Sequence, residues 1–117
     1  MGFLFGNSWK KKLLSRPPVS SDEFYKRFYS DSEFDKADVI DIRRLIANEY
    51  GIAEEHLMPS DRFRNELSDG VFWSWDDGYA ILAHNLEDIR VSKGLTPLEP
   101  FETIDDYIRQ ICGATAR

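Results

Sequence analysis

The stretch from residue 36 to residue 52, KADVIDIRRLIANEYGI, decides the fold. Its apolar residues recur at intervals of three and four, the period of an amphipathic helix. The apolar positions are Val39, Ile42, Leu45, Ile46 and Tyr50, while Asp38, Asp41, Arg43, Arg44 and Asn48 fall mostly on the other side. Gly51 suits a left-handed C-cap, and Ile52 is expected to fold back onto the helix end. The sequence therefore predicts a helix over residues 36–50.

Two more amphipathic helices are predicted towards the C-terminus. The first runs from about residue 75 to residue 90, with Ser74 as its N-cap. Its apolar face consists of Tyr79, Leu82, Ala83, Leu86 and Ile89. The second follows Thr103, which is its predicted N-cap, and is expected to stop at Gly113. Its buried stripe consists of Ile104, Tyr107, Ile108 and Ile111, and Asp105 and Asp106 lie in its first turn.

A short helix is predicted before residue 36. Ser20 and Glu23 have the spacing of a capping box, and the aromatic residues from Phe24 to Tyr29 give that helix a packing side. No segment shows the alternation of a strand, so the predicted fold class is all-α.

Residues 51–67 are predicted to form a long, ordered loop. Pro59, Ser60 and Asp61 interrupt any helix there, and a helical turn is expected near residues 62–67. Four apolar anchors are spaced too widely for one amphipathic helix: Ile52, Leu57, Phe63 and Leu67.

The first 19 residues differ from the rest in composition. They carry Lys10, Lys11, Lys12 and Arg16 without an acid, and Arg16-Pro17-Pro18 breaks any helix. We therefore divide the chain into a basic, flexible arm over residues 1–19 and one domain over residues 20–117. The arm's apolar residues also allow contact with an anionic membrane surface. A loosely packed leader is the preferred interpretation.

The charge balance bears on the kind of partner. Residues 1–19 hold +4, which leaves 11 of the 15 basic residues against all 21 acidic ones, a net charge of −10 for the domain. Such a domain repels phosphate backbones, so we expect no nucleic-acid binding and expect protein partners with basic surfaces. The chain has no apolar run that could span a bilayer and no signal-peptide pattern, so a cytoplasmic protein is expected. We also expect it to be a monomer.

Few residues suggest catalysis. The single cysteine, Cys112, excludes an internal disulfide and is expected to be buried or half-buried. His56 and His84 lie far apart in the sequence and are expected at the surface or at its boundary. No triad spacing and no glycine-rich phosphate loop is present. We expect a protein that is not an enzyme and that holds no metal.

The most unusual segment precedes the helix predicted near residue 75. Phe72, Trp73 and Trp75 lie within four residues, beside an acidic stretch. From Glu66 to Asp106 there are ten acidic residues and only two basic ones, Arg90 and Lys93. The aromatic residues either close the core over the loop or form an exposed platform for a partner. The candidate partner-binding residues are Trp73, Trp75, Asp76, Asp77, Tyr79, Glu87 and Asp88.

Taken in order, these features resemble the acyl carrier protein family over residues 36–112. The matching features are the helix end at Gly51-Ile52, the loop with Asp61, Phe63 and Glu66-Leu67, and the helix start at Thr103-Ile104. The resemblance implies a four-helix bundle, with the short helix after Ser20 as an addition and a long loop between the first two bundle helices. It also implies that the acidic second helix is the docking surface.

In working carrier proteins, a serine at the start of the second helix carries 4'-phosphopantetheine, which a helix N-terminus suits. Here the matching stretch is Trp73-Ser74-Trp75-Asp76, where the family has Asp-Ser-Leu. Alignment backwards from Leu82 and Leu86 places the serine position on Asp76 instead of Ser74. The preferred hypothesis is a carrier-like binding module without the arm; the alternative is a genuine carrier modified at Ser74.

Overall fold

Helix α4 spans Lys36–Tyr50, which confirms the helix predicted from the opening stretch. Most of its apolar stripe is buried, with Leu45 half-buried. Gly51 has a φ of 65°, and the N–H of Ile52 donates to the carbonyl of Ala47 at 3.0 Å. Glycine adopts this left-handed conformation without a Cβ penalty, so the helix ends where the sequence places its end.

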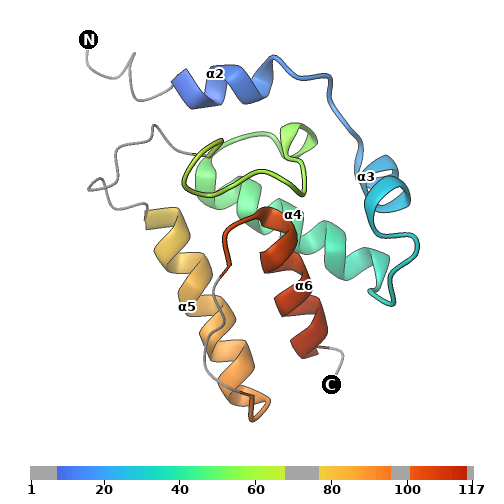
Figure 1. Cartoon of the computed structure of the whole chain (residues 1–117), viewed down its shortest axis with the longest axis vertical. Helices are drawn as coiled ribbons and strands as arrows, with labels where there is room; N and C mark the ends of the chain where they lie inside the picture. Colours follow the sequence, from blue (N-terminus) through green and yellow to red (C-terminus); the bar gives the residue numbers. More distant parts are fainter. Residues whose placement is uncertain (1–7, 68–76, 96–100, 116–117) are drawn as a thin grey trace.

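The structure is a computed structural model that describes residues 8–67, 77–95 and 101–115 (Figure 1). Its other α-helices are α2 (Ser8–Leu14), α3 (Ser21–Phe28), α5 (Asp77–Ser92) and α6 (Ile104–Thr115). A 3-10 turn spans Glu54–His56. The described residues contain no strand, only an isolated bridge between Arg62 and Thr103. The all-α fold class is confirmed for these residues.

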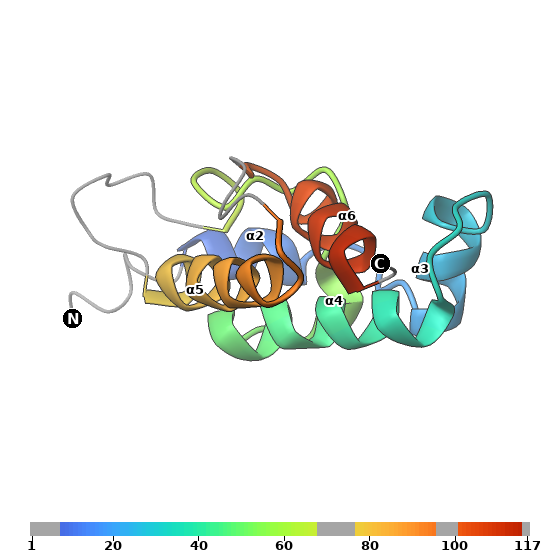
Figure 2. The ribbon, with the colours of Figure 1, turned by 90° about the horizontal axis from the view of Figure 1, so that it is seen from below.

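Helices α4, α5 and α6 pack against one another in pairs, and α3 lies beside the N-terminal end of α4 (Figure 2). The predicted stripe of α6 is confirmed, because all four of its residues are buried. On α5, Leu82 and Leu86 are fully buried, and the other three predicted residues pack half-buried against the same core. The hydroxyl of Tyr107 donates to the carbonyl of Leu82 at 2.8 Å, which joins α6 to α5 inside the core.

The loop between α4 and α5 is held as predicted, because all four of its apolar anchors are buried. Its backbone pairs with the segment before α6: the N–H of Phe63 donates to Glu102, and the N–H of Ile104 donates to Asp61, both at 2.9 Å. The expected helical turn over residues 62–67 is absent. Hydrogen-bonded turns replace it, since the amides of Asn65 and Leu67 both donate to the carbonyl of Arg62.

Reciprocal capping fixes the start of α6. The N–H of Asp106 donates to the hydroxyl of Thr103 at 3.0 Å, which confirms Thr103 as the cap. The Asp106 carboxylate in turn accepts from the amides of Glu102 and Thr103. The predicted stop at Gly113 is wrong, because α6 continues to Thr115. Gly113 has no positive φ, and Ala114 beyond it is buried, so packing carries the helix past the glycine.

We predict that Asp106→Ala lowers the free energy of unfolding by about 1 kcal/mol at neutral pH. Burial opposes ionisation of Asp106, but hydrogen bonds from Glu102 and Thr103 outweigh it, so its pKa lies below the ordinary value. A carboxyl whose pKa is depressed by folding stabilises the protein above the unfolded pKa, and this contribution is lost as the pH falls through the folded pKa. Urea unfolding should show the difference at pH 7 and lose it in strong acid. A difference independent of pH would contradict the charged cap.

The N-terminal residues pack more closely than the sequence indicated. We expected a flexible arm over residues 1–19, but residues 8–14 form helix α2, and Leu13 is fully buried. From α2 to α3 the chain runs along α4 (Figure 1). Trp9 meets Tyr50, the carbonyl of Val19 accepts from Arg43, and Asp22 pairs with Lys36. The domain core therefore begins before residue 20. The break at Pro17-Pro18 is confirmed, because α2 ends at Leu14.

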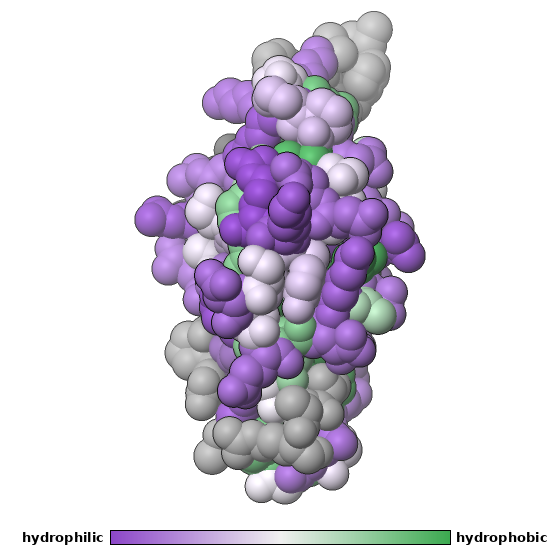
Figure 3. Space-filling model, turned by 90° about the vertical axis from the view of Figure 1, so that its right-hand side faces the viewer, coloured by the Kyte–Doolittle hydropathy of each residue, from purple (hydrophilic) through white to green (hydrophobic). Residues whose placement is uncertain are grey.

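The capping box of α3 is supported by the N–H of Glu23, which donates to the Ser20 hydroxyl at 3.2 Å. Phe24 is fully buried, in agreement with a packing role for the aromatic side of this helix. The side of the molecule that carries α3 is covered mostly by hydrophilic side chains (Figure 3).

One residue of α4 contradicts the predicted polar side. Arg43 is completely buried, with its guanidinium 4.0 Å from the ring centroid of Phe24. Its Nη2 donates to the carbonyls of Val19 and Leu57, both at 3.1 Å. Burial lowers the pKa of Arg43 to about 10, against the opposing attraction of Glu54 and Glu55. The helical period alone could not show this, because the covering carbonyls come from distant segments.

Candidate protein interface

Helix α5 carries the described part of the predicted interface. Its inner side is fixed by Leu82 and Leu86 in the core and by the hydrogen bond from Tyr107. The opposite side is exposed from Ala80 to Ser92 at helical spacing. The packing of the inner side against the core therefore leaves the outer side facing solvent.

Tyr79 lies on the inner side of this helix. Its ring stacks on Phe101 with centroids 4.7 Å apart, and its hydroxyl donates to the Phe101 carbonyl at 3.2 Å. Arg64 lies over the same ring at 5.6 Å. Burial raises the pKa of Tyr79, and Arg64 partly opposes this. Of the predicted partner-binding residues whose side chains the structure describes (Tyr79, Glu87 and Asp88), Tyr79 is the one held against the core.

The outer side of α5 combines apolar and acidic residues. Ile81 is 44% exposed and Val91 is 55% exposed, and these are two of the three large exposed apolar residues in the described chain. Glu87 and Asp88 are exposed between them. Residues 81, 84, 88 and 91 are three or four positions apart, so they line one face of the helix. We call Ile81, His84, Glu87, Asp88 and Val91 the α5 face.

The charge of the α5 face is negative. His84 is exposed, with its Nε2 3.4 Å from the Asp88 carboxylate. Arg90, the only arginine or lysine within α5, is buried on the inner side, and Lys93 follows the helix end. Acidic groups between two exposed aliphatic side chains fit a partner surface that offers both a cation and apolar contacts.

The structure brings together only part of the predicted site. Glu87 and Asp88 lie on the α5 face, and Asp77 is the first residue of α5. Trp73, Ser74, Trp75 and Asp76 lie outside the described residues, as does Phe72. Ile81 and Val91 were not singled out from the sequence. Their spacing from His84 and Asp88 is the signal that could have found them.

The single cysteine and the two histidines lie on three separate elements of the structure. Cys112 is buried, and burial raises the pKa of its thiol to about 12, which leaves it protonated at neutral pH. His56 is half-buried and His84 is exposed, as expected, and they lie on separate elements. In the described ranges, no three His, Cys, Asp or Glu side chains gather where they could hold a metal ion.

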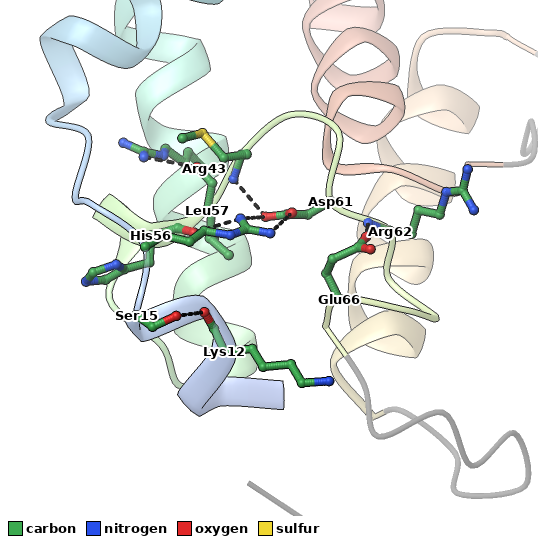
Figure 4. A network of polar contacts seen from close by, with 10 residues as sticks. Lys12, Ser15, Arg43, His56, Leu57, Asp61, Arg62 and Glu66 are labelled. Atoms are coloured by element: carbon green, nitrogen blue, oxygen red, sulfur yellow. Dashed lines mark hydrogen bonds and ion pairs between the residues drawn. The ribbon is translucent and has the colours of Figure 1, made fainter. Parts of the chain in front are cut away.

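A polar network that the sequence did not predict joins the N-terminal segment to the loop (Figure 4). Arg16 forms two hydrogen bonds with Asp61, at 2.9 and 2.8 Å. The Asp61 carboxylate is 2% exposed and also accepts from the amide of Met58 at 2.8 Å. Arg16 additionally donates to the carbonyl of His56 at 3.3 Å. Asp61 is thus a buried anchor for the segment that contains α2.

No protein-family model matches this chain, and no curated protein or solved structure gives a significant match. None of the described helices has the length and apolar character needed to cross a membrane. The function is therefore inferred from the residues of the chain itself.

Proposed function

We propose that this chain is an acyl-carrier-like helical module that is not an enzyme and that docks partner proteins through α5 and the tryptophan-rich residues before it, without a phosphopantetheine arm. The observation that carries the proposal is the α5 face. It joins two exposed aliphatic side chains to a pair of exposed carboxylates on a helix whose inner side is fixed in the core. Exposed apolar residues of this kind favour protein contact over a purely solvated surface.

The proposed fold is the carrier-type four-helix bundle, of which α4, α5 and α6 would be three helices, with α3 as an additional short helix. Three observations support it: the mutual packing of α4, α5 and α6, the long loop after α4, and the burial of the loop residues Asp61, Phe63 and Leu67. These loop residues belong to the set on which the family resemblance rests.

The proposed partner has a basic surface with apolar contacts. The domain after residue 19 carries a net charge of −10, so long-range attraction would guide such a partner to it. Glu87 and Asp88 would meet lysine or arginine side chains, while Ile81 and Val91 would supply buried area.

Charge reversal on the α5 face should abolish partner capture. In affinity capture from source cells, we expect the wild-type chain to retain a basic protein. The Glu87→Lys/Asp88→Lys variant should retain at least tenfold less of that protein. The matched control is Asp31→Lys/Glu33→Lys, which reverses two exposed acids after α3 and should change capture little. Equal losses would show that only the net charge matters.

Trp73→Ala should weaken the same complex without unfolding the domain. Collapse of the fold would instead place this tryptophan in the core.

Intact mass decides between a binding module and a genuine carrier. The purified chain is incubated with coenzyme A and a promiscuous phosphopantetheinyl transferase, beside a known carrier protein as positive control. We expect an unchanged mass. The gain of one phosphopantetheine, lost in Ser74→Ala, would instead establish a working acyl or aminoacyl carrier with the arm on Ser74.

A membrane-surface role for residues 1–19 is the weaker alternative. Leu13 is buried in the core and Trp9 packs half-buried on Tyr50, so these two apolar side chains of α2 already have protein contacts. Co-sedimentation with anionic vesicles that disappears when residues 1–19 are deleted would support this alternative. Sedimentation that persists after the deletion would remove it.

A further inference from the structure

The surface that α2 covers is separate from the α5 face, and its residues complement side chains of the N-terminal segment. Three side chains of the N-terminal segment reach it: two lie four positions apart on α2, and the third, three positions further on, lies just after the helix ends at Leu14. Trp9 meets the Tyr50 ring edge-on with centroids 6.1 Å apart, Leu13 is fully buried, and Arg16 binds the Asp61 carboxylate. We call the surface formed by Tyr50, Gly51, His56 and Asp61 the α2 seat.

Electrostatics favour a basic helix in the α2 seat. Lys10 crosses the C-terminal end of α4, since its Nζ would lie 3.3 Å from a Cβ placed on Gly51. The carbonyls at a helix C-terminus attract a cation. Asp61 is almost completely buried and needs a positive partner, and the segment as a whole carries +4 against a domain of −10.

The segment that fills the seat is short. Helix α2 has seven residues, and an isolated helix of this length is unstable in water, so its order depends on the seat. Its outer side exposes Lys11 and Leu14, the latter at 49%. It is followed by Pro17-Pro18, both exposed, and the chain is next held at Val19, whose amide donates to Glu55 at 2.8 Å. The segment before the prolines is therefore joined to the rest of the domain by an exposed Pro-Pro link.

We propose that the α2 seat is a docking site for a basic helical segment of a partner protein, with an aromatic residue, a leucine and an arginine at i, i+4 and i+7. In the free chain, α2 occupies this site in cis. Tethering gives the segment an effective concentration in the millimolar range, so it acts as a built-in competitor. The site is distinct from the α5 face and does not depend on its function.

Ring contacts connect the two surfaces. Tyr50 touches Phe63 at 5.8 Å between centroids, and Phe63 touches Tyr79 on α5 at 5.7 Å. A segment bound in the α2 seat at Tyr50 is therefore linked, through the ring of Phe63, to Tyr79 on the helix that carries the α5 face.

The test releases the segment of residues 1–17 as a free peptide after the full chain has folded. A protease recognition sequence is inserted between Pro17 and Pro18 of the full chain, and cleavage leaves a peptide of residues 1–17 beside the remaining body. Circular dichroism reports whether the body stays helical when the peptide is removed. Fluorescence anisotropy then measures rebinding of a labelled peptide of residues 1–17 to the body and to the uncleaved chain.

We expect the body to be less stable than the intact chain, because it loses Leu13 and Arg16, but to stay folded and to bind this peptide at least tenfold more tightly than the uncleaved chain does. Asp61→Asn in the body, or Arg16→Ala, Leu13→Ala or Trp9→Ala in the peptide, should each weaken binding at least tenfold. Asp31→Asn and Lys12→Ala, at exposed positions, are the matched controls and should leave it nearly unchanged.

Three results would overturn the proposal. If the body unfolds once the peptide leaves, α2 is an inseparable part of the core. If the body is folded but Asp61→Asn binds as tightly as the parent body, the seat has no specific site. If the uncleaved chain forms dimers at the concentrations at which the peptide binds, the occupant is a second copy of this chain and not a partner protein.

Discussion

Replacing Phe63 with alanine is expected to lower the free energy of unfolding by about 3–5 kcal/mol. The ring is fully buried and contacts four other aromatic rings from α4, α5 and the segment around α6. Its centroid lies 5.8 Å from Tyr50, 5.7 Å from Tyr79, 5.5 Å from Phe101 and 6.3 Å from Tyr107. Removing it would leave a cavity between elements that cannot all move inwards. For a domain with a total stability of about 5–15 kcal/mol, this is a large fraction.

Urea unfolding followed by circular dichroism measures this loss, with Phe34→Ala as the matched control. Phe34 is half-buried at the edge of the core and has Arg109 over its ring at 5.9 Å. Its truncation should lower the free energy of unfolding by about 1 kcal/mol. Similar losses from both changes would contradict a central role for Phe63.

Arg16→Ala is expected to lower the free energy of unfolding by about 3 kcal/mol, in the range for removing one partner of a buried ion pair. The carboxylate of Asp61 would keep its hydrogen bond from Met58 but lose both bonds from the guanidinium. A charge that is 2% exposed cannot recover these bonds from water without opening the loop. Arg16 itself is 29% exposed, so the cost falls on Asp61.

The control for this prediction is Arg109→Ala. Arg109 and Asp105 form an ion pair of similar length, 2.9 Å, between neighbouring turns of α6 at the surface. Its loss should change stability by about 0.5 kcal/mol or less. A double-mutant cycle of Arg16→Ala with Asp61→Asn should give a coupling energy of about 2 kcal/mol. A coupling near zero would mean that Asp61 is satisfied without Arg16.

Local signals were sufficient for α3, α4 and the start of α6, but α2 was not predicted from the sequence. The apolar period, the glycine at residue 51 and the Thr103 cap predicted α4 and the start of α6, because these depend on residues three to four positions apart. The end of α6 was missed, since Gly113 lowers helix propensity by only about 1 kcal/mol and the packing of α6 outweighs it. The candidate interface was predicted in part: Glu87 and Asp88 came from charge, while Ile81 and Val91 needed knowledge of which side of α5 is buried.

By itself, then, the sequence determined the helical class, the bounds of α4, the buried stripe of α6, the anchors of the loop and the acidic character of α5. Only the tertiary structure decided that Arg43 is buried, that Arg16 pairs with Asp61 and that α2 packs onto the domain. The physical reason is the same for all three. Each depends on groups 14 to 45 residues apart in the chain, such as the carbonyl of Leu57 for Arg43 and the carboxylate of Asp61 for Arg16. A local periodicity in the sequence cannot indicate such contacts, because these groups come together only in the folded core.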